Sequence, residues 1–94
     1  MNNMNIITLE EETNQYKWKI IINGKIIRFG AKGYTDYTLG ATKKQKENYI
    51  KRHELREDWT KNGIYTAGFW SRWLLWNKPT ITESIKDIER RFLK

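Results

Sequence analysis

Residues 16–29, YKWKIIINGKIIRF, decide the fold of this chain. Two runs rich in β-branched and aromatic residues flank the pair Asn23-Gly24. Such a pair is the strongest short-range signal for a β-hairpin, because a type I′ turn needs positive φ at both central residues. A two-residue turn also fixes the register, and it predicts the cross-strand pairs Ile22 with Lys25, Ile20 with Ile27, and Trp18 with Phe29.

The predicted hairpin has one apolar face and one face that is half cationic. Side chains alternate between the two faces of a strand, so the pairs above share the apolar face. The other face carries Lys17, Lys19 and Arg28 together with Ile21 and Ile26. Because an isolated hairpin is at best marginally stable in water, we expect helices to cover the apolar face.

The segments on either side of the hairpin have weaker signals. Residues 1–13 are polar, with Ile6, Ile7 and Leu9 as apolar anchors, which is typical of a tail or of one edge strand. Residues 30–40, GAKGYTDYTLG, contain three Gly and two Tyr, which favours a loop or a short third strand with tight turns. The hairpin is therefore expected to stand alone or to belong to a small three-stranded sheet.

The remaining sequence predicts three helices. The first begins near Thr42 or Lys43 and runs through good helix formers toward an end signal at Asn62-Gly63. The second is the densest apolar run, TAGFWSRWLLW at 66–76, which we expect to be buried. Thr80 and Glu83 predict a capping box for the third helix. A hairpin followed by helices is an α+β fold, and we take residues 14–94 as one basic domain.

The aromatic side chains are expected to dominate the core. Five Trp, five Tyr and three Phe are present, and rings bury more area than aliphatic side chains. Trp70, Trp73 and Trp76 recur at helical spacing, which is typical of a core face. The alternative is a base-stacking platform or a partner-binding face. We expect Arg72 and Lys78 to shelter the edge of this run through cation–π contacts.

The charge of the chain favours polyanionic partners. Lys and Arg number 18 against 11 Asp and Glu, which gives a net charge of +7. Three of the acidic residues, Glu10, Glu11 and Glu12, lie in the N-terminal segment, so residues 14–94 hold 18 basic against 8 acidic side chains. The domain itself is therefore more cationic than the whole chain.

Several classes of site and location are not expected. The chain has no Cys, which removes disulfides and thiol nucleophiles, and His53 has no second His to complete a metal site. No apolar run approaches the roughly 20 residues that span a bilayer, and no signal pattern begins the chain. We therefore expect an intracellular protein that is not secreted, does not insert into membranes and has no enzymatic activity, cofactor or small-molecule substrate.

Basic and aromatic residues together predict a nucleic-acid-binding surface. Neutralised phosphates release counterions, and exposed rings can stack on unpaired bases. A solvated surface of a Lys-rich protein is the alternative explanation. The candidate binding residues are Lys17, Lys19, Arg28, Lys32, Tyr34, Tyr37, Lys43, Lys44, Lys46, Lys51, Arg52 and Arg56.

Three motifs carry a resemblance to a known family. GYTDYT at 33–38, RH at 52–53 and TAGFWSRWLLWNKPT at 66–80 make the chain similar to a family of short uncharacterised proteins encoded by large double-stranded DNA viruses of eukaryotes. The resemblance runs from about Tyr16 to Phe92. It implies a virion component or a protein of the infected host cytoplasm or viral factory. It implies no activity and no site residues.

Two functional hypotheses follow from these observations. The first is a non-enzymatic protein that binds DNA or RNA without sequence specificity, through the phosphate backbone. The second is a virion structural or minor capsid-associated protein that docks on a larger viral protein. The distribution of charge on the fold distinguishes them, because a continuous stripe of cations favours nucleic acid and an exposed apolar patch favours a protein partner.

Overall fold

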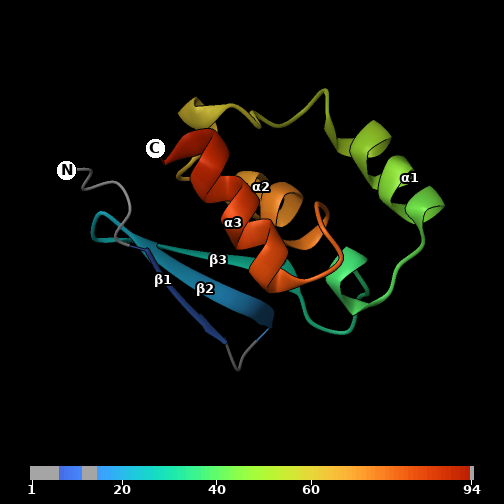
Figure 1. Ribbon diagram of the computed structural model, residues 1–94, viewed down its shortest axis with the longest axis horizontal. Coiled ribbons are helices and arrows are strands. Elements are labelled where there is room, and N and C mark those ends of the chain that lie inside the picture. The colour runs from blue at the N-terminus through green and yellow to red at the C-terminus, as the bar shows by residue number, and fades with distance from the viewer. Residues whose placement is uncertain (1–6, 12–14, 94) are drawn as a thin grey trace.

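A three-stranded antiparallel sheet forms one layer of the fold, and helices α2 and α3 lie over it (Figure 1). The computed structural model describes residues 7–11 and 15–93. The strands lie in the order β1-β2-β3. Their bounds, and those of the helices, are β1 Ile7–Glu11, β2 Tyr16–Ile22, β3 Lys25–Ala31, α1 Lys43–His53, α2 Ala67–Trp70 and α3 Ile81–Phe92. The described residues also form two 3₁₀ turns, η2 Tyr37–Leu39 and η3 Lys61–Gly63, and one π-helical turn, η4 Ser71–Leu75.

The predicted hairpin is confirmed, including its register. Asn23 and Gly24 have φ angles of 52° and 80°, as a type I′ turn requires. The strands pair Ile22 with Lys25, Ile20 with Ile27, and Trp18 with Phe29.

The third strand comes from the N-terminal segment. β1 pairs antiparallel with β2, and Leu9 lies opposite Ile20. The alternative of a short third strand within 30–40 is wrong, because only Gly30 and Ala31 of that segment extend β3. The chain then turns into η2, where the carboxylate of Asp36 accepts hydrogen bonds from the backbone amide and the hydroxyl of Thr38. The rest of the predicted N-terminal tail, residues 1–6 and 12–13, lies outside the described residues.

The first helix begins as predicted and ends earlier. Thr42 and Gln45 form a full capping box, in which each side chain accepts a hydrogen bond from the other's backbone amide. The expected continuation toward Asn62-Gly63 does not form, because α1 ends at His53. Beyond it, the side chain of Glu57 bonds His53 and Trp59, and these side-chain contacts accompany a change of chain direction.

The Trp-rich run is one short α-helix followed by a π-helical turn. Phe69, Trp70, Leu74 and Leu75 are buried, as expected of a core segment. Gly30 of β3 lies close beneath this run, because a Cβ at Gly30 would approach Leu75 Cδ1 to 2.8 Å.

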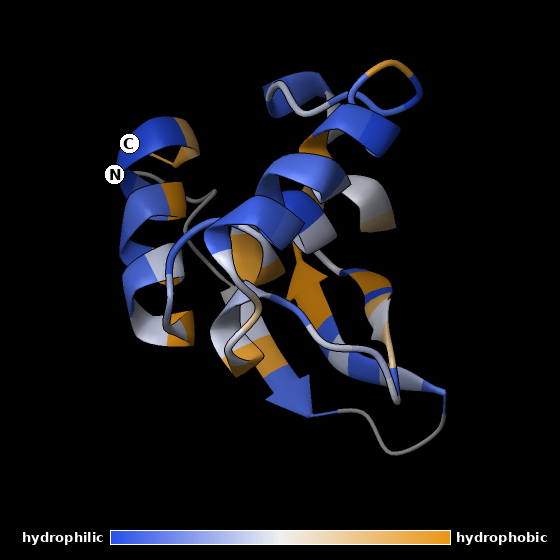
Figure 2. Ribbon diagram, turned by 90° about the vertical axis from the view of Figure 1, so that its right-hand side faces the viewer, coloured by the Kyte–Doolittle hydropathy of each residue, from blue (hydrophilic) through white to orange (hydrophobic). Residues whose placement is uncertain are grey.

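The last helix has half of its predicted capping box. Thr80 Oγ1 accepts a hydrogen bond from the Glu83 amide, and the Glu83 carboxylate bonds the Thr80 hydroxyl instead of its backbone amide. In Figure 2 this helix turns its hydrophobic residues toward the rest of the molecule.

The core is shared by the sheet and the helices and is rich in rings. The ring centroids of Phe29 and Phe69 lie 6.5 and 5.1 Å from that of Trp70. Trp73 and Trp76 are only partly buried and pack at the margin of this core. The α+β class and the aromatic core are therefore confirmed. The buried apolar residues are Ile20, Ile22, Ile27, Phe29, Ile64, Phe69, Trp70, Leu74, Leu75, Ile88 and Leu93.

The hairpin turn at Asn23-Gly24 allows a direct test of backbone strain. Gly24→Val is expected to lower the free energy of unfolding by about 1–3 kcal/mol, because a β-branched residue resists positive φ. Crowding makes no contribution, since a Cβ at Gly24 meets nothing within 4 Å. Thermal unfolding measures the loss. Gly24→Asn is the control, because Asn tolerates this conformation, and equal losses in both variants would contradict the assigned cause.

Candidate functional site

The hairpin cations are engaged with neighbouring groups. The Lys17 ammonium lies 2.6 Å from Asp36 Oδ2, and the two side chains are 13% and 1% exposed. Lys17 therefore holds the 33–36 loop instead of presenting a free charge. Lys19 lies 3.3 Å from Glu10 Oε1 and opposite Arg28 in the sheet. Lys17 and Lys19 are therefore paired with carboxylates within the fold, whereas Arg28 is exposed.

The predicted residues of the loop and of α1 differ in exposure. Lys32 and Tyr34 lie in the exposed turn after β3, and Tyr34 is 72% exposed. Lys46 is half-buried: its ammonium donates to the Asn77 carbonyl at 2.6 Å and lies 4.8 Å from the centroid of the Tyr37 ring. The exposed cations of this part of the chain are Lys43, Lys44, Lys51, Arg52 and Arg56.

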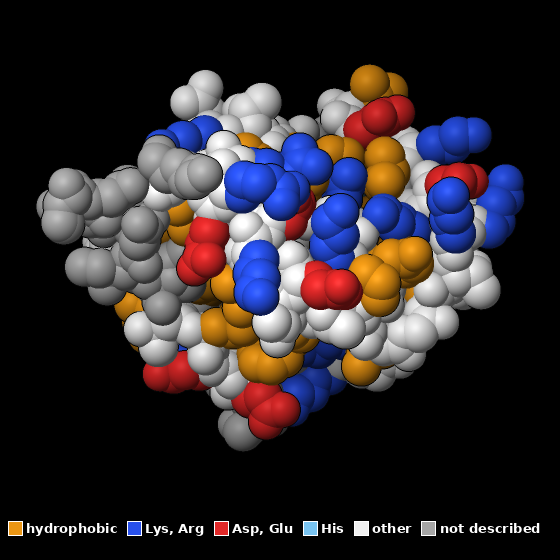
Figure 3. Space-filling model, in the orientation of Figure 1, with side chains coloured by type: hydrophobic (Ala, Val, Ile, Leu, Met, Phe, Trp, Pro, Cys, Tyr) orange, Lys and Arg blue, Asp and Glu red, His pale blue; other side chains and the backbone are white. Residues whose placement is uncertain are grey.

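Lys46 belongs to a cationic cluster that sequence reasoning missed. We call this cluster the basic face. Figure 3 shows Lys and Arg side chains gathered across one side of the molecule, from α3 toward α1. Burial lowers the pKa of Lys46, and the positive charges of Arg72, Lys78 and Lys43 lower it further. The members of the basic face are Lys43, Lys46, Arg72, Lys78, Arg90 and Arg91.

Arg72 connects the basic face to the Trp residues. Its guanidinium lies 4.4 Å from the centroid of the Trp73 ring and 5.4 Å from that of Trp59, and it donates to the Trp76 carbonyl at 2.8 Å. Its Nε is buried without a hydrogen-bond partner in the described part of the chain. Burial lowers the pKa of Arg72, and Arg91 adds to this effect. The cation–π contact expected of Arg72 is present.

Asp87 is the buried counter-charge of the basic face. It is 2% exposed and accepts hydrogen bonds from Asn77 Nδ2 and Arg91 Nε, each at 2.8 Å, and from Arg90. Burial alone would raise the pKa of this carboxyl group. The bonds from Asn77 and Arg91 and the charges of both arginines outweigh burial and hold the pKa below its ordinary value.

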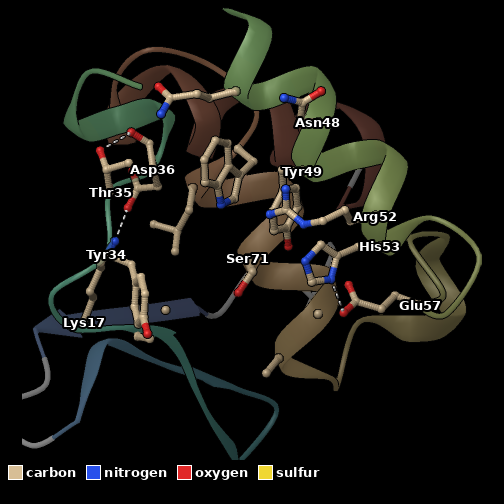
Figure 4. A pocket seen from close by; sticks show the side chains of 17 residues that line it. Lys17, Tyr34, Thr35, Asp36, Asn48, Tyr49, Arg52, His53, Glu57 and Ser71 are labelled. Atoms are coloured by element: carbon tan, nitrogen blue, oxygen red, sulfur yellow. Dashed lines mark hydrogen bonds and ion pairs between the residues drawn. The ribbon is translucent and has the colours of Figure 1, made fainter. Parts of the chain in front are cut away.

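A cleft of about 710 Å³ opens between β3, α1 and the Trp-rich run, and none of its lining residues belongs to the basic face. We call it the Tyr34 cleft. Figure 4 shows Tyr34, Thr35 and Asp36 on one side of it and the α1 residues Asn48, Tyr49 and Arg52 on the other. Ser71, Leu75 and Trp76 also line it. The cleft therefore joins the end of the hairpin, α1 and the Trp-rich run.

The α1 wall of this cleft is held by a stack of rings. Tyr49 lies between His53 and Trp76, with ring centroids 4.3 and 4.7 Å away. His53 Nδ1 lies 3.2 Å from Glu57 Oε2, and Glu57 Oε1 accepts a hydrogen bond from Trp59 Nε1. Burial raises the pKa of the Tyr49 phenol well above its ordinary value. His53 thus has a structural role in this wall.

A second cavity of about 620 Å³ lies on the other side of Tyr34. Trp18, Leu39 and Ile81 contribute to its lining, and Leu39 is 64% exposed. Apolar surface of this kind is what a protein partner covers.

The described residues contain neither a cluster of metal ligands nor a membrane-spanning helix. No group of three or more His, Asp or Glu side chains in 7–11 and 15–93 could hold a metal ion. None of the helices in these ranges has the length and apolar character that crossing a membrane requires.

Comparison with known proteins gives one family match. No curated protein and no solved structure matches the chain. The family model that does match covers only part of the chain and ends before the Trp-rich motif at 66–80. It therefore bears neither on that motif nor on a viral source. Residues 12–53, which include β2, β3 and α1, match a family of unknown function, DUF5754.

Proposed function

We propose that this protein is a non-enzymatic nucleic-acid-binding protein that acts on the phosphate backbone of DNA or RNA through electrostatics. The observation that carries the proposal is the basic face, where Lys46 lies among three other cations and two arginines pair with the buried carboxylate of Asp87. Like charges placed this close raise the local potential and favour a polyanion. Each phosphate that binds relieves repulsion among the cations.

The composition of the basic face suits contacts to phosphates better than sequence-specific contacts to bases. Arg90 and Arg91 are 62% and 45% exposed, so each guanidinium has donors available to a ligand beyond those it gives to Asp87. Guanidinium and ammonium groups are the main phosphate ligands in protein–nucleic acid complexes. Lys44, which is exposed in the first turn of α1, follows Lys43 of the basic face directly in the sequence.

The second candidate function is docking on a larger protein. The exposed Leu39 and Tyr34 beside the second cavity favour it. In a viral setting that partner would be a structural or capsid protein, and the protein would act in the virion, the host cytoplasm or a viral factory. The resemblance of the 33–38, 52–53 and 66–80 motifs to viral proteins supports that setting.

A salt series tests the electrostatic proposal. We expect the affinity for duplex DNA to fall linearly with log salt, with a slope of about −0.9 per phosphate contacted. The double variant Lys43→Gln, Lys78→Gln is expected to flatten this slope by up to about two contacts. Neither side chain is hydrogen-bonded to the described part of the chain, so melting should change little. Fluorescence anisotropy gives the affinities.

Two exposed lysines outside the basic face provide the matched control. Lys25→Gln with Lys61→Gln removes the same charge from the tip of the hairpin and from η3 and is expected to leave the slope near the wild-type value. If both double variants lose the same affinity, net charge and not the basic face is responsible. If the wild type binds neither DNA nor RNA at about 0.1 M salt, the proposal fails.

A further inference from the structure

We propose that the Tyr34 cleft binds one unpaired nucleotide of a single-stranded nucleic acid. This inference rests on the function proposed above and assigns a second contact in addition to the basic face. A base is a flat ring with apolar faces, a polar edge and a phosphate on either side along the strand. The cleft offers a partner for each of these parts.

The size of the cleft and its exposed ring suit a base. Its volume of about 710 Å³ lies within the range of small-molecule sites, about 300–1,000 Å³. Tyr34 stands at its rim and is 72% exposed, whereas Tyr49 in the opposite wall is 7% exposed and already stacked on both faces. Stacking on a base would cover an aromatic ring that the chain leaves in water.

Polar groups for the base edge and the phosphate line the same cleft. The Asn48 carboxamide and the Ser71 hydroxyl each offer a donor and an acceptor, and neither bonds another described residue. The Arg52 guanidinium is likewise without a hydrogen bond to the described chain and can take a phosphate through two parallel bonds. Figure 4 shows Asn48 and Arg52 on the α1 side and Ser71 between the two walls.

Both walls are held in place before any ligand binds. The Lys17–Asp36 ion pair, 2.6 Å long and buried on the Asp36 side, holds the loop that carries Tyr34. The Trp76–Tyr49–His53 stack and the His53–Glu57 bond hold the α1 wall. A site organised in this way loses little conformational entropy on binding. A duplex hides its bases within the stack, so the cleft distinguishes single strands from duplexes.

The test compares single-stranded and duplex DNA of equal length, about 12 nucleotides, at one salt concentration. Tyr34→Ala is expected to weaken single-strand binding about tenfold, the usual scale of one base–aromatic contact, and to leave duplex binding unchanged. Tyr34→Phe should retain single-strand binding, since it keeps the ring. Asn48→Ala is expected to weaken single-strand binding less than Tyr34→Ala does. Photocrosslinking of an iodouracil-containing strand should attach it to Tyr34, as mass spectrometry of the peptides would establish.

The control is a second exposed tyrosine outside the cleft. Tyr65 is 40% exposed and lies under Lys25, so Tyr65→Ala removes a ring and leaves the cleft intact. If Tyr34→Ala and Tyr65→Ala have equal effects on single-strand binding, the cleft assignment is wrong while the salt-dependent binding of the basic face stands. If the wild type retains no nucleic acid at about 0.1 M salt, the proposed function itself fails, and this inference fails with it.

Discussion

Replacing Trp70 with Ala is expected to lower the free energy of unfolding by about 3–5 kcal/mol, the usual cost of deleting a large buried ring. Trp70 is 1% exposed and contacts the rings of Phe29 and Phe69. Its Nε1 donates to the Ile64 carbonyl at 2.7 Å, so the variant leaves both a cavity and a buried carbonyl without this partner. Urea denaturation at neutral pH measures the loss.

Trp73→Ala is the matched control within the same run. Trp73 is only partly buried, and its two contacting guanidiniums, Arg72 and Arg91, lie 4.4 and 4.8 Å from the ring centroid. We expect a smaller loss, about 1–3 kcal/mol, because part of the ring already contacts water and charged groups. Equal losses of unfolding free energy in the two variants would mean that the difference in burial between Trp70 and Trp73 does not decide their contributions to stability.

The hairpin could be predicted from local rules alone. Its turn needs two adjacent residues that accept positive φ, and Asn23 and Gly24 are adjacent in sequence. The register then follows by counting outward from the turn. In the same way, Thr42 and Thr80 mark helix starts, because a cap acts within three residues.

The N-terminal strand was predicted only as an alternative to a tail, and the structure confirms the strand. β1 joins β2 through a pairing of Leu9 with Ile20, and the polar Glu10 and Glu11 gave that strand a weak pattern. The end of α1 was missed. Residues 54–58 contain good helix formers, but Asp58 Oδ1 accepts hydrogen bonds from the backbone amide and the hydroxyl of Thr60, and such a local side-chain-to-backbone bond competes with a helix.

The sequence predicts that Lys and Arg residues form a binding site, but it does not show which of them lie together in the fold. Charge counting singled out Lys43 and Lys46, which lie together in the basic face, and also Lys17, which is paired with Asp36 within the fold. The arginines of η4 and α3 reach Lys46 only through tertiary packing, with about 25 to 45 residues between them in sequence. Local sequence patterns cannot predict which residues far apart in the chain are brought together by tertiary packing. The Tyr34 cleft is equally a product of packing, because its walls come from β3, α1 and the Trp-rich run.

Asp87→Asn is expected to lower the free energy of unfolding by about 2–3 kcal/mol at neutral pH. The carboxylate accepts from Asn77, Arg90 and Arg91, and an amide of the same shape offers one acceptor atom and no charge. The expected loss is smaller than that for a fully buried ion pair, because the two arginines are 62% and 45% exposed and partly hydrated. Glu89→Gln, which removes one exposed charge from the same helix, is the control and should cost little.

Wild type should have a higher free energy of unfolding than Asp87→Asn at neutral pH, and this difference should shrink as the pH falls. The pKa of Asp87 is lowered in the folded chain, so the carboxylate stabilises the fold wherever the unfolded chain would also be ionised, above its ordinary pKa of about 3.9. The advantage is lost as the pH falls below that value and through the folded pKa. Denaturation of both proteins across this range gives the difference. An advantage that stays constant into acid would mean that the shape and not the charge of Asp87 matters.

The same variant separates stability from binding. Asp87 reduces the positive potential of the basic face while it holds Arg90 and Arg91 in position. Its loss therefore has opposite consequences for the two properties: the fold weakens, and the net charge of the basic face rises by one. Well below its melting temperature, Asp87→Asn should bind duplex DNA at least as tightly as wild type if the arginines contact phosphates. Weaker binding by a variant that circular dichroism reports as folded would mean that Asp87 acts by fixing the two guanidiniums in a required geometry, so that orientation and not potential limits the affinity.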